Sequence, residues 1–459
     1  MTGSSSRLNL MPVAGAAENA PGRLAKIAVW CLVALLMAAP LAFGAVEAWA
    51  WTTLSIAVLL LSFAWAVHCW RSGWLKVVWS PLLVPPLALL ALAVVQLRAG
   101  WTLDGAATRE AIIKLLSGLL VLFLGLQFLA GASFRLWRGL ALAISLYAFG
   151  LALFAVIQFF ASPDLLYFII RPRWGGYVFG PYVSHNNYAG LMEMLAAIAA
   201  GLALALRRRH PAKLLAVFAV LLCMVSVLLS GSRGGVVSLL AEFAIFMTVM
   251  LLAGPAIQPR RRALLAGFSL ALLAGASFLW LDSGGVWNRW QQLAETRELT
   301  AGDRARMSAD TWRMARDHAD HGVGLGAFAT AYPAYQTVIT DDFIDYAHND
   351  YLQLAAEGGV TAWILILLGV PGFVWLAFRG LRRRLRQPAG WLQTGAAVGV
   401  CGMLVHSLVD FNLHIPANAA WLAFCAALAL AAPGESRLAE SLRQRRRKLS
   451  RPLDLPRHS

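Results

Sequence analysis

Three short segments of the sequence hold residue types that can bind anions or move protons. The first, residues 171–194, contains Arg173 and the pair His185-Asn186, placed directly before a long apolar run. A helix that begins there would leave backbone N–H groups free to bind an anion, and the arginine would add positive charge. The alternative is an aromatic belt at a membrane interface, closed by a polar helix cap.

The second segment is the glycine-rich turn SGSRGG at residues 230–235. Its glycines would let the backbone approach a ligand closely, and the planar guanidinium of Arg233 matches the geometry of phosphate oxygens. The structural alternative is a tight turn whose arginine extends its charged end to water. We expect Arg233 to bind an oxyanion.

The third segment is a long polar stretch, residues 282–357. A helical pattern around residues 307–319 predicts an amphipathic helix on a membrane surface, with Arg304 and Arg306 at its start. Further along, the glycines of residues 322–326 imitate a dinucleotide-binding fingerprint, but no strand–helix–strand unit surrounds them. We therefore expect no nucleotide site there.

The same stretch ends in His348-Asn349-Asp350, directly before another expected helix. A neutral His348 could accept a proton from an incoming hydroxyl group, with Asp345, Asp350 or Glu357 orienting it. The alternative is a structural histidine whose hydrogen bonds are satisfied within the fold.

Ionisable residues also stand within or beside apolar runs, where they are functional candidates by default. They are Lys114, Glu193, Glu242, His406 and Asp410. Glu193 and Glu242 could support Arg173 or Arg233 by ion pairing, or could form pairs that stabilise a helix bundle.

The composition indicates which elements position these residues. Of the 459 residues, 59% are hydrophobic and 14% are charged, and the mean hydropathy is +0.65, whereas a soluble domain has about 25% charged residues. This excludes a soluble enzyme, a nucleic-acid-binding protein and a disordered scaffold. Long unbroken apolar runs also exclude a barrel of alternating strands, and five scattered cysteines indicate neither disulfides nor a thiolate metal site.

The sequence predicts an all-α, polytopic membrane helix bundle of about 12 transmembrane helices, with a long periplasmic loop between spans 9 and 10. We expect a cytoplasmic tail at 1–25, spans 1–9 within 26–281, the loop at 282–357, spans 10–12 within 358–432, and a basic tail at 433–459. The expected spans are 27–46, 50–70, 78–97, 111–130, 137–160, 186–206, 212–230, 235–253, 263–281, 358–378, 391–410 and 415–432.

Charge sets the expected orientation. Most of the 39 Lys and Arg residues fall in the two terminal tails and in alternate loops, which places both termini in the cytoplasm under the positive-inside rule. The net charge of +16 therefore reports topology and contact with anionic membrane lipids, and not a nucleic-acid surface. The three candidate segments all fall on the opposite, outer side.

Several arginines and one histidine at an outer membrane surface suit a lipid diphosphate substrate. The arginines would neutralise the diphosphate leaving group, and the histidine would activate an acceptor hydroxyl. No Asp-x-Asp occurs in the outer loops, so no metal or other cofactor is expected, although Asp341-Asp342 with Asp345 forms one dense acidic cluster.

Against this background the chain resembles the O-antigen ligase/polymerase family of bacterial inner membranes. The resemblance is carried by Ser232-Arg233-Gly234, by MARDHADHGVGLGAF at 314–328 and by AHNDYLQLAAEGG at 347–359. One departure is visible, because His318 is followed by Ala319 where members often have proline. This puts the local turn geometry in doubt, but not the activity.

The resemblance implies metal-independent, inverting transfer of a glycan from an undecaprenyl-diphosphate carrier on the periplasmic face. When the family's residue roles are carried over, Arg233 binds the diphosphate and His348 is the base. Arg173 is a looser match to a diphosphate-binding arginine, and either Arg304 or Arg306 is the arginine of the long loop. The acceptor would be lipid A core for a ligase or another lipid-linked glycan for a polymerase. The competing classes are a secondary transporter of an anion or sugar and a non-catalytic subunit of a polysaccharide assembly machine.

Overall fold

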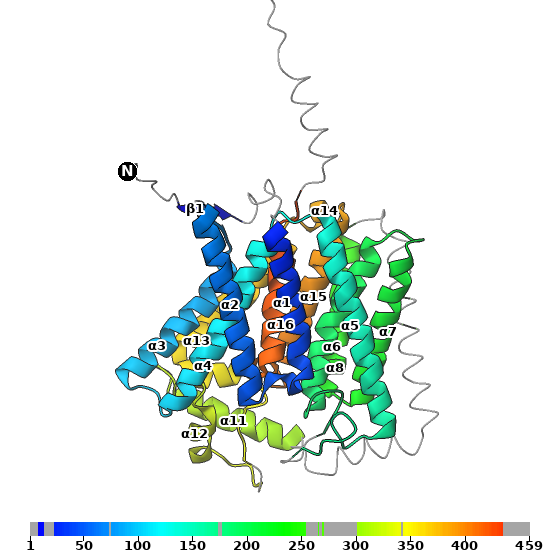
Figure 1. The fold of residues 1–459 in the computed structure, drawn as a ribbon. Helices are drawn as coiled ribbons and strands as arrows, with labels where there is room; N and C mark the ends of the chain where they lie inside the picture. Colours follow the sequence, from blue (N-terminus) through cyan, green and yellow to red (C-terminus); the bar gives the residue numbers. More distant parts are fainter. Residues whose placement is uncertain are drawn as a thin grey trace, which may run out of the picture.

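The fold is a bundle of long helices with a smaller layer at one end (Figure 1). The computed structural model describes residues 8–12, 23–72, 75–172, 177–253, 265, 269, 301–340 and 343–434. Ten helices in these ranges are long and apolar enough to cross a membrane. They are α1 Arg23–Leu41, α2 Ala48–Ser72, α3 Val84–Ala99 together with the preceding 3-10 turn η3 Pro81–Leu83, α4 Gly105–Leu129, α5 Phe134–Ala161, α6 His185–Ala205, α7 Pro211–Ser230, α8 Arg233–Leu252, α13 Asp350–Phe378 and α15 Pro388–His406.

The predicted all-helical, polytopic architecture is therefore confirmed. A further apolar helix, α16 Pro416–Leu430, is shorter than the others. The span expected over 263–281 lies outside the described residues, so the expected total of twelve stays a prediction.

Several helix limits differ by a few residues from the expected spans, and two limits near the outer segments are set by polar residues. Helix α13 begins at Asp350, where the sequence predicts a helix, since Asn349 caps its N-terminus by accepting hydrogen bonds from the backbone N–H groups of Tyr351 and Leu352. It continues into the span expected at 358–378 across a kink at Gly359, whose φ is +59°. Helix α15 ends at His406 and not at 410. Asp410 therefore lies in the loop between α15 and α16, outside both helices.

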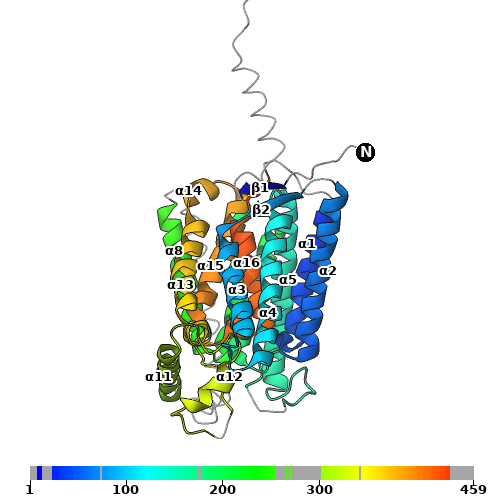
Figure 2. The same ribbon diagram turned by 90° about the vertical axis from the view of Figure 1, so that its left-hand side faces the viewer.

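The two ends of the bundle carry different secondary structure (Figure 2). One end, here called the basic end, carries the short helix α14 Leu381–Arg384 and a two-stranded parallel sheet. In this sheet β1 Leu8–Pro12 pairs with β2 Leu75–Trp79, an addition that the helical pattern did not predict. The opposite end, here called the α11 end, carries α11 Ala301–Asp317, α12 Phe328–Ala331 and a 3-10 turn, η5 Tyr332–Ala334.

Helices α6 and α15 pack closely at the centre of the bundle through small residues. A side chain at Gly395 would come within 2.5 Å of the backbone oxygen of Ala197, and one at Gly201 within 2.6 Å of the backbone oxygen of Trp391. Gly399 faces Met194 in the same way, one turn further along α15. Close backbone approach of this kind replaces the hydrophobic driving force that is missing between helices in lipid.

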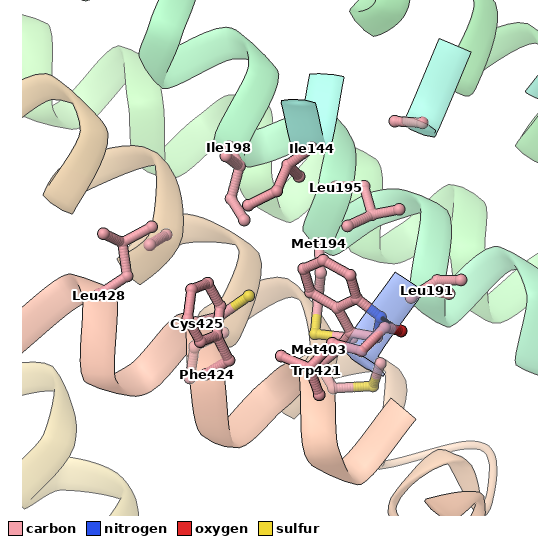
Figure 3. Close-up of a cluster of buried hydrophobic side chains, with 14 of the residues drawn as sticks. Ile144, Leu191, Met194, Leu195, Ile198, Met403, Trp421, Phe424, Cys425 and Leu428 are labelled. Carbon is pink, nitrogen blue, oxygen red and sulfur yellow. Dashed lines mark hydrogen bonds between the residues drawn. The ribbon is translucent and has the colours of Figure 1, made fainter. Parts of the chain in front are cut away.

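Around this contact lies a large apolar core to which α5, α6, α15 and α16 contribute (Figure 3). Trp421 of α16 is fully buried and donates its indole N–H to the backbone oxygen of Leu36 in α1 at 2.7 Å. This bond satisfies the polar atom of a large buried side chain and ties α16 to α1. The bundle thus holds α6, α8 and α15 in fixed positions relative to the α11 end.

The layer at the α11 end has an apolar cluster of its own. Met307 and Met314 on one face of α11 pack with Phe328, Tyr332 and Ala355. The opposite face of α11 is exposed, so the predicted amphipathic helix is present. Because α13 contributes to this cluster, α11 is held against the start of a long helix.

Candidate functional site

The sequence His348-Asn349-Asp350-Tyr351 is bonded to the C-terminal end of α15. The amide of Asn349 donates to the backbone oxygen of Leu408 at 2.9 Å, and the Tyr351 hydroxyl donates to that of Leu404 at 2.7 Å. The backbone N–H of Asp350 donates to the oxygens of Ser407, at 2.9 Å, and Asp410, at 3.2 Å. Carbonyl groups at a helix end lack hydrogen-bond donors within the helix, and residues 349–351 supply those donors.

Asp350 also bonds the segment that follows the loop. Its carboxylate accepts the backbone N–H of Leu413 at 3.1 Å and lies 2.9 Å from Nδ1 of His414. Burial lowers the pKa of His414, but its hydrogen bond and charge interaction with Asp350 outweigh burial, so the net pKa shift is upward. Asp350 therefore fixes the loop after α15 instead of orienting His348, which was one of the sequence-based alternatives.

His348 has a different kind of environment from its neighbours in the motif. Its backbone φ is +48°, in the left-handed region that few residues other than glycine adopt. Its ring packs edge-on against Phe411, and its side chain keeps 20% of its surface exposed. Strained backbone that is held in place by surrounding bonds is typical of functional positions.

The carboxylate nearest to His348 among the described residues is Asp410. Nδ1 of His348 lies 3.6 Å from Oδ1 of Asp410, which is almost completely buried. Burial would raise the pKa of Asp410, but His348, His406 and Arg304 lower it to about 2. Asp410 is therefore ionised at neutral pH and faces the histidine from the side opposite to solvent.

Arg304 brings positive charge from α11 to the same place. It is partly buried and interacts electrostatically with Asp410 and with His185 at the start of α6. Its Nε atom is buried and has no hydrogen-bond partner among the described residues. A buried guanidinium nitrogen without a partner is a group that an anionic ligand would satisfy.

Arg306, the other arginine proposed for this segment, differs from Arg304. It is exposed and lies 3.9 Å from Asp303 one turn earlier on the same helix. Of the two, Arg304 is the one that the structure brings to His185 and Asp410.

The motif Ser232-Arg233-Gly234 starts α8 beside this cluster. The Ser232 hydroxyl caps the helix by accepting the N–H of Gly235 at 3.1 Å. A side chain at Gly234 would lie 2.7 Å from the imidazole of His406, so glycine is required for the two to pack. Arg233 itself is exposed at the first position of the helix.

Glu193 and Glu242 lie deeper in the bundle, and neither is paired with Arg233 among the residues that the structure describes. Glu193 is bonded to Nδ1 of His406, with distances of 3.2 and 3.3 Å to its two oxygens. Glu242 packs against Gly402 of α15 and interacts electrostatically with Glu193. Of the two alternatives considered, the structure shows for Glu193 a pair within the bundle, and no ion pair with Arg233 among the described residues.

The glycine-rich segment 322–326 is held between α3 and α13. Gln96 of α3 donates to the backbone oxygens of His321, at 2.6 Å, and Glu357, at 2.8 Å, and accepts the N–H of Leu325 at 3.0 Å. The Glu357 carboxylate accepts the N–H of Gly326 at 2.9 Å and an N–H of Gln353 at 3.1 Å. Glu357 thus braces this segment and does not contact His348.

The remaining predicted residues have simpler positions. Arg173 lies outside the described residues, as do Asp341 and Asp342. Asn186 is buried in the first turn of α6. Among the residues that the structure describes, no cluster of three or more His, Cys, Asp or Glu side chains is placed to hold a metal ion.

The sequence did not pair His348 with Asp410. The only feature of the sequence that pointed to Asp410 is its position at the edge of an apolar run, where an acidic residue is unusual. Its partner could not be read from spacing, because the contact depends on the bonds between 349–351 and the end of α15.

The fold defines this chain as a multi-pass helical membrane protein. Residues 217–368, from within α7 to within α13, match the family model described as O-antigen ligase, and this match supports membership of the O-antigen ligase/polymerase family and glycan transfer of that general type. The matched segment includes Arg233, Arg304 and His348, whereas His406 and Asp410 follow it. The search of curated proteins found no match.

Proposed function

We propose that this protein transfers a glycan from an undecaprenyl-diphosphate carrier to an acceptor hydroxyl on the periplasmic face of a bacterial inner membrane. The observation that carries the proposal is the position of His348, which is partly exposed at the α11 end and faces the ionised Asp410 at 3.6 Å. In this proposal the α11 end faces the periplasm, and both termini are cytoplasmic.

In the proposed reaction His348 takes the proton of the acceptor hydroxyl as general base. The acceptor oxygen forms a bond to the anomeric carbon while the bond from that carbon to the diphosphate breaks, which inverts the configuration. Undecaprenyl diphosphate leaves with the electron pair of the broken bond. Asp410 stabilises the imidazolium that forms on His348.

Positive groups at the α11 end would bind the leaving diphosphate. Arg304 presents an unpartnered buried Nε, Arg233 is exposed at the start of α8, and α6 begins nearby at His185. The N-terminal ends of helices carry partial positive charge, which adds to that of the arginines. Arg306 is not needed for this arrangement.

The acceptor defines two versions of the function. A ligase would attach the glycan to lipid A core, and a polymerase would attach it to another lipid-linked glycan. We infer chemistry that requires no metal ion, because the residues named above supply both the base and the charge that the leaving group needs.

The proposal is tested with purified protein in liposomes, supplied with undecaprenyl-diphosphate-linked oligosaccharide with or without lipid A core, in EDTA. Product that appears only with core supports a ligase, and longer glycans formed without core support a polymerase. Loss of all product in EDTA, restored by a divalent ion, would contradict the metal-independent mechanism.

A transporter is favoured by one observation, the burial of Glu193, Glu242 and His406 within the bundle. Uptake of free anion or sugar into the same liposomes, without any glycan product, would support that function and overturn ours. Glycan product without uptake would exclude it.

A further inference from the structure

Two buried ionisable residues lie directly behind the proposed site and have no role in the reaction as written above. They are Glu193 of α6 and His406 of α15, whose side chains have no exposed surface. Nδ1 of His406 lies 3.2 Å from Oε2 of Glu193, and Nε2 of His406 lies 3.8 Å from Oδ2 of Asp410. Burying such groups is costly in a membrane protein, so their arrangement calls for an explanation.

These contacts form a continuous chain of four groups. It runs from Glu193 to His406, from His406 to Asp410, and from Asp410 to His348, with distances of 3.2, 3.8 and 3.6 Å. Its inner end lies within the bundle, and its outer end is the partly exposed His348. Asp410 is therefore placed between two imidazole rings.

The geometry also indicates how His406 is protonated. A neutral imidazole has one N–H donor, whereas each nitrogen of His406 faces a carboxylate. When both nitrogens carry a proton, His406 donates a hydrogen bond to Glu193 and places positive charge 3.8 Å from Asp410. This charge between the two carboxylates offsets the cost of burying them. His406 is then an imidazolium that links Glu193 to Asp410.

Other charged or titratable groups face this chain from the surrounding helices. Glu242 of α8 interacts with Glu193, and Asp350 of α13 interacts with His406. Arg304 of α11 and His185 of α6 both interact with Asp410. Asp345, in the segment before His348, interacts electrostatically with His348 itself.

We propose that Glu193 and His406 are positioning residues of the transfer reaction, which act through Asp410 on His348. Glu193 holds His406 in its charged form, and His406 orients Asp410 and offsets part of its negative charge. This offset sets how strongly Asp410 stabilises the protonated form of His348. The inference rests on the proposed function, because it requires His348 to act as base.

The proposal predicts the direction of a shift in the pH profile. In Glu193→Gln, His406 loses an anionic partner and gives up its second proton, so the negative charge of Asp410 acts on His348 without compensation. The protonated form of His348 then persists to higher pH, and a protonated histidine cannot act as base. The acid limb of the rate profile should move upward by about one pH unit.

The experiment measures the rate of glycan transfer in liposomes between pH 5 and 9 for wild type, Glu193→Gln, His406→Gln and Asp410→Asn. Glu193→Gln and His406→Gln should both move the acid limb upward, whereas Asp410→Asn should move it downward. In the double variant Glu193→Gln/Asp410→Asn, the upward shift should be largely lost, because Glu193 acts through Asp410. Glu110→Gln, at an exposed carboxylate paired with Lys114 on α4, is the matched control.

Each outcome has a distinct meaning. A uniform fall in rate with the acid limb unmoved in Glu193→Gln and His406→Gln would assign the pair a structural role and overturn the inference. If one variant fails to insert, the other still decides, because both are expected to shift the profile in the same direction. Absence of product with wild-type protein would instead contradict the proposed function itself.

Discussion

At the scale of single residues, Asp410 determines the electrostatics of the site. Its pKa of about 2 lies below the ordinary aspartate value of 3.8, despite burial, because His348, His406 and Arg304 surround it. Since the folded-state pKa is lowered, the stabilisation is present above about pH 4 and is lost as the pH falls toward 2. The shift corresponds to about 2 kcal/mol.

We predict that Asp410→Asn lowers the transfer rate at neutral pH by 10- to 100-fold, because the imidazolium on His348 loses the anion that lies 3.6 Å from it. Such a fall corresponds to a barrier raised by about 1.4–2.7 kcal/mol. The variant should also lose less stability than wild type between about pH 4 and 2. Thermal unfolding in detergent across this range checks the second point. An unchanged rate would show that Asp410 does not act on the histidine.

The two loop arginines give a second prediction at this scale. Arg304→Gln should weaken donor binding about 10- to 100-fold, since it removes a charged hydrogen-bond donor from a partly buried position. Arg306→Gln should change it less than about threefold, because exposed pairs such as Arg306 with Asp303 contribute about 1 kcal/mol or less. Binding of fluorescent undecaprenyl-diphosphate-linked glycan measures both, and the reverse order would contradict our assignment.

The sequence could name both arginines but could not choose between them. Arg304 and Arg306 are close neighbours on one amphipathic helix, and which of them turns toward the bundle depends on how α11 packs on α13. The same limit applied to Glu193, whose partner His406 lies on a helix far along the chain.

At the scale of elements, the glycines of α15 determine whether the site is assembled. We predict that Gly395→Ala destabilises the protein by at least about 1–3 kcal/mol, because its new methyl group would overlap the backbone of α6. Gly150→Ala in α5 is the matched control, since nothing lies within 4 Å of its new methyl group. That variant should be neutral or slightly stabilised. Equal unfolding temperatures for the two would contradict the packing described.

Helix α11 depends on one buried carboxylate. Asp310 accepts the N–H of Thr337 at 2.8 Å and the hydroxyl of Tyr332 at 3.2 Å, and it pairs with Arg313. Burial raises its pKa, but these bonds lower it overall, so its stabilising effect is present above about pH 3.8 and is lost below that value.

We predict that Asp310→Asn loosens α11 by about 2–4 kcal/mol, because an amide cannot accept all of these bonds with the strength of a carboxylate. Hydrogen exchange of residues 301–317 at neutral pH should then be faster, whereas exchange in α6 should not change. Arg316→Gln, at an exposed position of the same helix, is the control. Unchanged protection of α11 would show that Asp310 is not what holds it.

Most element limits followed from hydropathy, because a membrane-spanning helix needs a long apolar run. The limit expected at 410 was misplaced, since the end of α15 at His406 depends on hydrogen bonds between segments distant in sequence. The parallel pair of β1 and β2 was not predicted either. Its strands are short, and one of them belongs to a polar N-terminal stretch.

At the scale of the whole molecule, the helix bundle fixes the positions of the site residues, and the layer at the α11 end adds positive charge. Helices α6, α8 and α15 bring Glu193, the start of α8 and His406 together, while α11 adds Arg304. His348 stands where these parts meet, at the border between the bundle and the α11 layer. The proposed general function followed from three sequence motifs, but the four charged groups from Glu193 to His348 could be connected only from the fold.

The central claim is that His348 is the base of a glycan transfer reaction. The most direct test is single-turnover transfer from undecaprenyl-diphosphate-linked oligosaccharide in liposomes, comparing wild type with His348→Ala. His318→Ala, at another histidine of the α11 end with its ring near Tyr335, is the control.

The account predicts that His348→Ala inserts and binds donor normally but transfers glycan about 100- to 10,000-fold more slowly, the range for a lost general base. The control should remain within about threefold of wild type, as expected for a surface substitution. Transfer by His348→Ala at the wild-type rate would contradict the claim.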